Sequence, residues 1–209
     1  MTATITSPQN RKTRRRQRTR QQLLDATQKL ILEHGYDDSS AEAVAELADL
    51  GRSTFYNHFN NKQEAVLAML TQHYHDYGDL AYIPLEDTPD RAESVARSSL
   101  RVFTAMARDP LTRKLIDKPR FLASAIADSQ AEFMARDFAE GIVQGRFKFA
   151  VSMESMAIVL NWSYVGMLIT AINQDSIEET RLEWTRYLLF NLGIPENEIE
   201  SLISAALEH

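Results

Sequence analysis

Residues 39–62, SSAEAVAELADLGRSTFYNHFNNK, constrain the possible fold of this chain more than any other stretch. Apolar side chains over residues 40–47 recur at the spacing of one helix face, which predicts a first short helix. A second helix is predicted to open at Gly51, with Phe55 and Phe59 facing inward. Two short helices about a tight turn are typical of a helix-turn-helix, and we predict that motif here.

The start of the first helix and the turn after it each carry a local signal. Ser39, followed three residues later by Glu42, has the pattern of a capping box, which predicts that this serine caps the helix. Asp49 stands in the turn, and aspartate tolerates the left-handed backbone conformation better than most residues. We therefore expect the turn to form with aspartate at this position.

The side chains left outside this predicted core suit contacts with DNA. A recognition helix reads base edges in a major groove about 12 Å wide, so its first turns need short or fork-shaped hydrogen-bonding groups. Arg52 is able to bind a guanine with two hydrogen bonds, and Asn57 is able to pair with an adenine edge. Hydroxyl and ammonium groups suit phosphate oxygens. The predicted DNA-contact residues are Ser40, Arg52, Ser53, Thr54, Tyr56, Asn57, His58 and Lys62.

Three dipeptides and one longer motif match the pattern of a known family: Gly35-Tyr36, Ser39-Ser40, Val44-Ala45, and Thr54-Phe55-Tyr56-Asn57-His58-Phe59 with Lys62. They resemble the DNA-binding domain of the TetR family of transcriptional regulators, over residues 16–77. The resemblance implies that Tyr56, His58 and Lys62 lie at the DNA. It also implies a C-terminal helical domain that holds a small molecule and forms a dimer through a four-helix interface.

Basic residues are concentrated near the N-terminus. Residues 1–62 carry a formal charge of +3 and residues 63–209 one of −9, and seven basic side chains lie between Arg11 and Arg20. Their repulsion disfavours a helix unless DNA phosphates neutralise them, and residues 1–10 are expected to be disordered. We predict that residues 1–15 are a flexible basic arm; a solvated tail without DNA contacts is the alternative. The predicted phosphate or minor-groove contacts come from Arg14, Arg15 and Arg16.

Composition excludes several classes of protein. With 44% hydrophobic and 25% charged residues, the chain is of the soluble globular type. The absence of cysteine excludes disulfides and thiolate metal sites, and no apolar run has the form of a signal peptide. The most apolar stretch, residues 156–172, is shorter than the roughly 20 residues of a membrane span and is predicted to be a buried helix. We expect a cytoplasmic protein with no cofactor, metal or membrane partner.

The C-terminal two thirds of the chain predict helices. Glycine and proline residues over residues 77–88 indicate a loop, which separates a predicted domain at 16–77 from one at 78–209. Residues 152–172 are apolar on nearly all faces, and such a helix must be covered on all sides. We expect a second subunit to cover it and the next helix, with Trp184 in the interface. The predicted fold is all-α, a three-helix DNA-binding domain followed by a helical bundle for ligand binding and dimerisation.

Aromatic and thioether side chains at helical spacing in this bundle are candidates for a ligand pocket, although such residues more often belong to an ordinary core. The candidates are Phe103, Met106, Phe121, Met134, Phe138, Trp162, Tyr164 and Met167. They favour a small-molecule effector that is partly apolar.

Together these features predict a homodimeric transcriptional regulator, a repressor released from double-stranded operator DNA by its effector. Two alternatives stay open, a DNA-binding protein without an effector and an α-helical enzyme. The sequence contains no glycine-rich phosphate loop before a helix, no metal-spaced cluster and no nucleophile elbow. We therefore expect no enzymatic activity.

Overall fold

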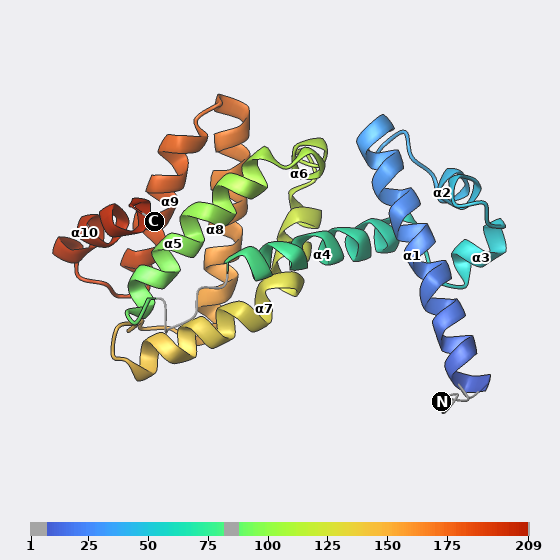
Figure 1. Ribbon diagram of the computed structural model, residues 1–209. Coiled ribbons are helices and arrows are strands. Elements are labelled where there is room, and N and C mark those ends of the chain that lie inside the picture. Colours follow the sequence, from blue (N-terminus) through green and yellow to red (C-terminus); the bar gives the residue numbers. More distant parts are fainter. Residues whose placement is uncertain (1–7, 82–87, 209) are drawn as a thin grey trace. The chain divides into compact units, whose positions relative to one another are not determined.

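A computed structural model describes residues 8–81 and 88–208, and all regular structure within these ranges is helical. The all-α prediction is confirmed. The helices, labelled in Figure 1, are α1 (Pro8–His34), α2 (Ala41–Leu47), α3 (Arg52–Tyr56), α4 (Lys62–Ala81), α5 (Arg91–Arg108), α6 (Pro110–Lys114), α7 (Pro119–Val143), α8 (Met153–Gln174), α9 (Ile177–Asn191) and α10 (Glu196–Leu207).

The chain forms two compact units whose border falls within α4, between Met69 and Leu70. The predicted domain border after residue 77 stays a prediction. The predicted loop at 77–88 begins later than expected, because α4 continues to Ala81. Residues 82–87 lie outside the described residues, as do residues 1–7 of the predicted arm.

The N-terminal unit is built from α1, α2, α3 and the first turns of α4. α2 contacts both α1 and α3, and the rings of Phe55 and Phe59 are buried, with centroids 5.7 Å apart. Asp49 adopts a left-handed conformation with φ 55°, so the turn between α2 and α3 forms with aspartate at this position, as predicted. Because the two rings occupy the core, the polar residues of α3 remain outside.

The capping prediction for α2 is wrong by one residue. Ser40 caps the helix, because its Oγ accepts a hydrogen bond of 3.0 Å from the amide of Ala43. The buried Ser39 instead donates from its Oγ to the carbonyl of Gly35, at 2.7 Å, and so closes the end of α1. Two adjacent serines offer the same chemistry, and packing against α1 decides which one is free to cap.

The basic run is helical in the structure, which differs from the expected flexible arm. α1 includes residues 8–20 without a break, since no proline or glycine follows Pro8 before Gly35. Arg14, Arg15 and Arg16 are exposed, so water solvates their charges along the helix. The run therefore presents a regular row of cations, and its contacts with DNA stay a prediction.

The C-terminal unit is a bundle organised around α5, which contacts α6, α7, α8, α9 and α10 (Figure 1). Leu100, Phe103 and Met106 bring the apolar face of α5 into the core. Asp90 caps α5 and Ser152 caps α8, through bonds of 2.9 and 3.1 Å to the amides of the first turn. Burial of this apolar surface is the main contribution to the stability of the bundle.

α8 is the one helix, among the residues that the structure describes, that is long and apolar enough to cross a membrane. It packs against α5, α7 and α9, and its residues Leu160, Val165 and Leu168 are buried. The inner face of α8 thus belongs to the protein core, as the sequence predicted. Its outer face leaves several large apolar residues of α8 exposed in the single chain, and coverage of this face by a second subunit stays a prediction.

Gly193, which ends α9, gives a test of this packing. Its φ is +85°, and a Cβ at this position would collide with the backbone carbonyl of Lys148. We expect Gly193→Ala to lower the free energy of unfolding by on the order of 3 kcal/mol, since it combines left-handed strain with a backbone clash. Gly166→Ala is the control, because Gly166 has open space in α8 and alanine should stabilise a helix interior by about 1 kcal/mol. Urea unfolding measures both; equal midpoints for the two variants would contradict the packing.

Candidate DNA interface and ligand cavity

The predicted DNA-contact residues surround α3. Ser40 caps α2, Lys62 begins α4, and Asn57 and His58 directly follow α3. Most of the set is exposed, and the partly buried members are Thr54, His58 and Lys62. The structure therefore brings hydroxyl, amide, imidazole and cationic groups to one motif of the N-terminal unit. Their contacts with DNA remain a prediction.

Arg52 is held by two neighbours on this surface. Its Nε lies 2.9 Å from a carboxylate oxygen of Glu42 in α2, and its guanidinium lies 5.6 Å from the centre of the Tyr56 ring. Both partners of the ion pair are well exposed, and an exposed pair of this kind contributes at most about 1 kcal/mol. A base edge or phosphate can therefore compete for Arg52. The sequence pattern assigned Glu42 to a cap and gave no sign of this contact, because it depends on the angle between α2 and α3.

Lys62 has a structural role that the sequence did not reveal. Its Nζ donates hydrogen bonds of 2.8 Å to the carbonyls of Tyr36 and Ser39, and it lies 4.0 Å from the centre of the Tyr36 ring. The ammonium thus ties the first turn of α4 to the loop between α1 and α2. Since an ammonium has three donors, a phosphate contact remains compatible with this geometry.

The basic run of α1 meets the helix-turn-helix at His58. The pKa of His58 is lowered by partial burial and by the positive charges of Arg16 and Arg20. Arg20 also lies 5.1 Å from the centre of the Phe59 ring. These contacts place part of the cationic side of α1 beside the residues that follow α3. A phosphate lying there would meet the cations of α1.

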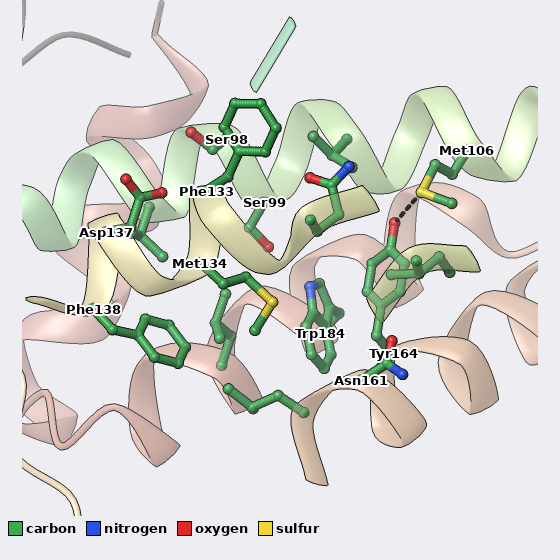
Figure 2. A pocket seen from close by; sticks show the side chains of 16 residues that line it. Ser98, Ser99, Met106, Phe133, Met134, Asp137, Phe138, Asn161, Tyr164 and Trp184 are labelled. Carbon is green, nitrogen blue, oxygen red and sulfur yellow. Dashed lines mark hydrogen bonds between the residues drawn. The ribbon is translucent and has the colours of Figure 1, made fainter. Parts of the chain in front are cut away.

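The C-terminal unit contains a cavity of about 150 Å³ among α5, α7, α8 and α9 (Figure 2). Four predicted ligand-binding residues line it, namely Met106, Met134, Phe138 and Tyr164. Phe103, Phe121 and Met167 are outside its lining, and Trp162 lines a second hollow. The full lining is Val95, Ser98, Ser99, Val102, Met106, Ile126, Gln130, Phe133, Met134, Asp137, Phe138, Leu160, Asn161, Tyr164, Trp184 and Leu188.

Most of the cavity wall is apolar, and its polar groups are held in place. The hydroxyl of Tyr164 donates to the sulfur of Met106 at 3.2 Å, and burial raises the pKa of this tyrosine. The side-chain amide of Asn161 donates from Nδ2 to the carbonyl of Ala123 at 2.9 Å. Burial also raises the pKa of Asp137, although the charges of Arg91 and Arg136 partly offset that effect. A wall of this kind suits a small ligand with few polar groups.

Two lining residues connect the cavity to α4 within the C-terminal unit. Gln130 donates from Nε2 to the backbone carbonyl of Tyr74 at 2.9 Å, and the rings of Phe133 and His75 lie 5.7 Å apart. A ligand that displaces either side chain would disturb these contacts with α4. Gln130 could not be singled out from the sequence, because a glutamine in an amphipathic helix carries no distinctive pattern.

A second hollow of about 420 Å³ lies between α7 and α8. It is lined partly by small α7 residues, and it shares Met134, Phe138 and Asn161 with the first cavity. These three side chains therefore separate the two spaces.

The outer faces of α8 and α9 expose large apolar residues. Ile158, Val159, Trp162 and Phe190 each retain about half or more of their accessible surface, from 49% to 62%. Trp184, which we expected in an interface, is only 5% exposed and lines the cavity instead. Helical periodicity marks both tryptophans as apolar but does not show which of the two is buried in the core of the chain. We name Ile158, Val159, Trp162 and Phe190 the outer apolar face.

Comparison with known proteins identifies the N-terminal motif. Residues 23–69 match the family described as bacterial regulatory proteins, tetR family. The chain is 32% identical over 100 residues to the HTH-type transcriptional regulator TtgR of Pseudomonas putida, covering 47% of this chain and 48% of that protein. It is 28% identical over 127 residues to the HTH-type transcriptional repressor KstR of Rhodococcus jostii, covering 59% of each. The chain thus spans about half the length of the curated relatives it matches.

Solved structures share the fold of the chain. RolR in complex with its ligand resorcinol has a TM-score of 0.78 at 20% identity, covering 92% of this chain and 96% of that one. FadR of Thermus thermophilus in complex with lauroyl-CoA has a TM-score of 0.66 at 18% identity, covering 82% and 93%. The family match shows that this chain carries a DNA-binding domain of the TetR family over residues 23–69, and the solved structures share the all-helical fold of the chain.

Proposed function

We propose that this protein is a cytoplasmic, homodimeric transcriptional repressor that leaves its operator when a small molecule occupies the 150 Å³ cavity. The observation that carries the proposal is the helix-turn-helix itself. Phe55 and Phe59 fill its core, while Arg52, Asn57 and neighbouring polar groups stay accessible. Two helices that only packed in a bundle would have no reason to keep these polar side chains accessible above a buried aromatic core.

Dimerisation is supported by the outer apolar face. Exposed apolar patches on a soluble protein mark sites of association. The residues of the outer apolar face lie on α8 and α9, two helices that contact one another. Twofold symmetry would then pair two helix-turn-helix motifs with two half-sites about one helical turn, or a multiple of it, apart. We propose that the operator is nearly palindromic for this reason.

Control by an effector is supported by the cavity and by its contacts with α4. Gln130 and Phe133 line the cavity and touch Tyr74 and His75, and α4 is one unbroken helix from Lys62 to Ala81. Two structures with this fold, RolR and FadR, were solved with resorcinol and lauroyl-CoA. The effector must bind the DNA-incompetent form more tightly, and a coupling of about 1–3 kcal/mol would change operator affinity about 5- to 150-fold.

The experiment that tests this function is selection of duplexes from a random library by the full chain. The proposal predicts enrichment of a near-palindrome with two half-sites. Enrichment of a single half-site would contradict the dimer, and the absence of any preferred sequence would contradict the regulator itself.

Base recognition gives a more local prediction. We expect Asn57→Ala to lose sequence preference at one position of each half-site, at a cost of about 1–3 kcal/mol if its amide pairs with an adenine. Asn197→Ala is the matched control, since Asn197 is an exposed asparagine of α10 in the other unit. Affinities for the operator and for its single-base variants measure the effect. A uniform loss on all duplexes would show that Asn57 does not read a base.

A further inference from the structure

The 150 Å³ cavity has the size of a single aromatic ring. An engineered protein cavity of about 150 Å³ with an apolar lining holds one benzene molecule, which sets the scale. The wall here carries four aromatic side chains, and the rings of Tyr164 and Trp184 meet edge to face at 5.1 Å. Apolar walls with aromatic edges favour a flat aromatic ligand over a long flexible chain. Size and shape therefore indicate a ligand with one ring.

The charges around the cavity favour a neutral ligand. None of the 16 lining residues is lysine, arginine or histidine, so an anionic group would enter without a cationic partner. The one acidic residue, Asp137, has its carboxylate 3.5 Å from Nη1 of Arg91 and 3.5 Å from Nε of Arg136. Two guanidinium groups already offset its charge, which leaves little attraction for a cationic ligand.

The amide oxygen of Asn161, in the cavity wall, lacks a hydrogen-bond partner in the described part of the chain. Oδ1 of Asn161 is buried and accepts no hydrogen bond from any residue that the structure describes. Its orientation is fixed, because Nδ2 of the same side chain donates to the carbonyl of Ala123. Figure 2 shows Asn161 grouped with Tyr164 and Trp184 at one side of the cavity. A buried acceptor without a donor is costly, so a ligand hydroxyl at this point would be favoured.

We propose that the cavity binds a neutral molecule with one aromatic ring and a hydroxyl group that donates a hydrogen bond to Oδ1 of Asn161. This ligand class rests on the proposed function of the cavity as an effector site. The ring fills the space among Phe133, Phe138 and Trp184, and the hydroxyl reaches the side of the cavity that Asn161 and Tyr164 form.

Calorimetric titration of the full chain with five probes tests the class: phenol, toluene, benzoate, benzylammonium and 2-naphthol. Phenol is expected to bind about tenfold more tightly than toluene, because toluene leaves the acceptor of Asn161 unpaired. Benzoate and benzylammonium are expected to bind more weakly than phenol because of their charge, and 2-naphthol because of its second ring. Tighter binding of any of these four than of phenol would overturn the proposal.

Two substitutions locate the site. Val102 lines the first cavity and not the second hollow, so Val102→Phe should abolish phenol binding by filling the space. Val143→Phe is the matched control, since Val143 is 88% exposed and should leave binding unchanged. Unaltered phenol affinity in Val102→Phe would place the probe elsewhere and overturn the proposal.

Asn161→Leu tests the hydrogen bond. The ratio of phenol to toluene affinity should fall from about ten to about one, while continued binding of toluene shows that the cavity is intact. A phenol-to-toluene affinity ratio that stays near ten would show that Asn161 does not accept a hydrogen bond from the ligand. If Asn161→Leu does not fold, thermal shifts of the wild-type protein by phenol and by anisole, whose methylated oxygen donates no hydrogen bond, decide the same question; an equal shift overturns the proposal.

Failure of the proposed ligand class can be distinguished by experiment from failure of the proposed function. Wild-type protein is assayed for operator binding without any probe. Selective operator binding with no affinity for phenol would overturn the ligand class and leave the DNA-binding regulator intact. If the protein bound phenol in the cavity but selected no operator, the ligand class would be supported and the proposed function would be contradicted.

Discussion

Trp162→Glu should convert the protein to a monomer and lower its affinity for a palindromic operator by about 10²- to 10⁴-fold, the loss expected when two linked binding events become one. Trp162 is 51% exposed on the outer apolar face and lies one helical turn after Ile158 and Val159 in α8. A large aromatic at the centre of an interface contributes strongly, and a carboxylate there would be buried without a partner. Binding to random DNA should persist at a low level, since each N-terminal unit remains folded.

The control for this change is Val143→Glu, which places the same charge on an 88% exposed residue at the end of α7. Analytical ultracentrifugation and operator titration are the measurements. A variant at Trp162 that stays dimeric and binds the operator normally would show that the outer apolar face is not the dimer interface. A wild-type monomer at micromolar concentration would remove the premise altogether.

The triple variant Arg14→Ala, Arg15→Ala and Arg16→Ala should weaken binding to operator and random DNA by similar factors. Each phosphate contact contributes about 0.9 to the slope of log affinity against log salt, so about six lost contacts per dimer should reduce the slope by about five. The three arginines are exposed on α1, the helix whose Arg16 and Arg20 lie close to His58. The expected loss is therefore largest at low salt.

A matched control removes the same charge from the C-terminal unit, through alanine at the exposed residues Arg101, Arg120 and Lys148. If net charge alone governed DNA binding, both triple variants would reduce the slope of log affinity against log salt by the same amount. An unchanged slope in the α1 variant would instead support the alternative that this run is a solvated segment without DNA contacts.

The helix-turn-helix could be predicted from sequence because its information is local. The spacing of Phe55, in α3, and Phe59, just after it, indicates which side of the motif is buried, and the tolerance of Asp49 for positive φ allows the turn. The cap of α2 could not be assigned from local sequence alone. Ser39 and Ser40 have the same side chain, and the hydrogen bond of Ser39 to the carbonyl of Gly35 leaves Ser40 as the cap.

The role of Lys62 lay beyond sequence reasoning for a different reason. Its acceptors are the backbone carbonyls of Tyr36 and Ser39, and every residue has a carbonyl. No residue type in the loop therefore signals the contact. The ion pair of Arg52 with Glu42 was missed in the same way, because it depends on how two helices cross.

The cavity was predicted only in part. Phe103 and Met106 lie within one turn of α5, yet Met106 lines the cavity while Phe103 packs against Tyr164 with ring centroids 5.5 Å apart. Periodicity finds the apolar face of a helix but does not say which part of that face a neighbour fills. For the same reason the two tryptophans were misplaced. Trp162, predicted to line the pocket, is exposed on the outer apolar face, and Trp184, predicted at the interface, lines the cavity.

In the proposed mechanism, ligand and operator weaken each other's binding through a shared conformational equilibrium. Calorimetric titration of phenol into the protein, with and without saturating operator duplex, tests it most directly, because coupling between two binding sites is reciprocal. We predict that the operator weakens phenol binding by the same factor, about 5- to 150-fold, by which phenol weakens operator binding. Identical phenol affinities in the two titrations would contradict this mechanism.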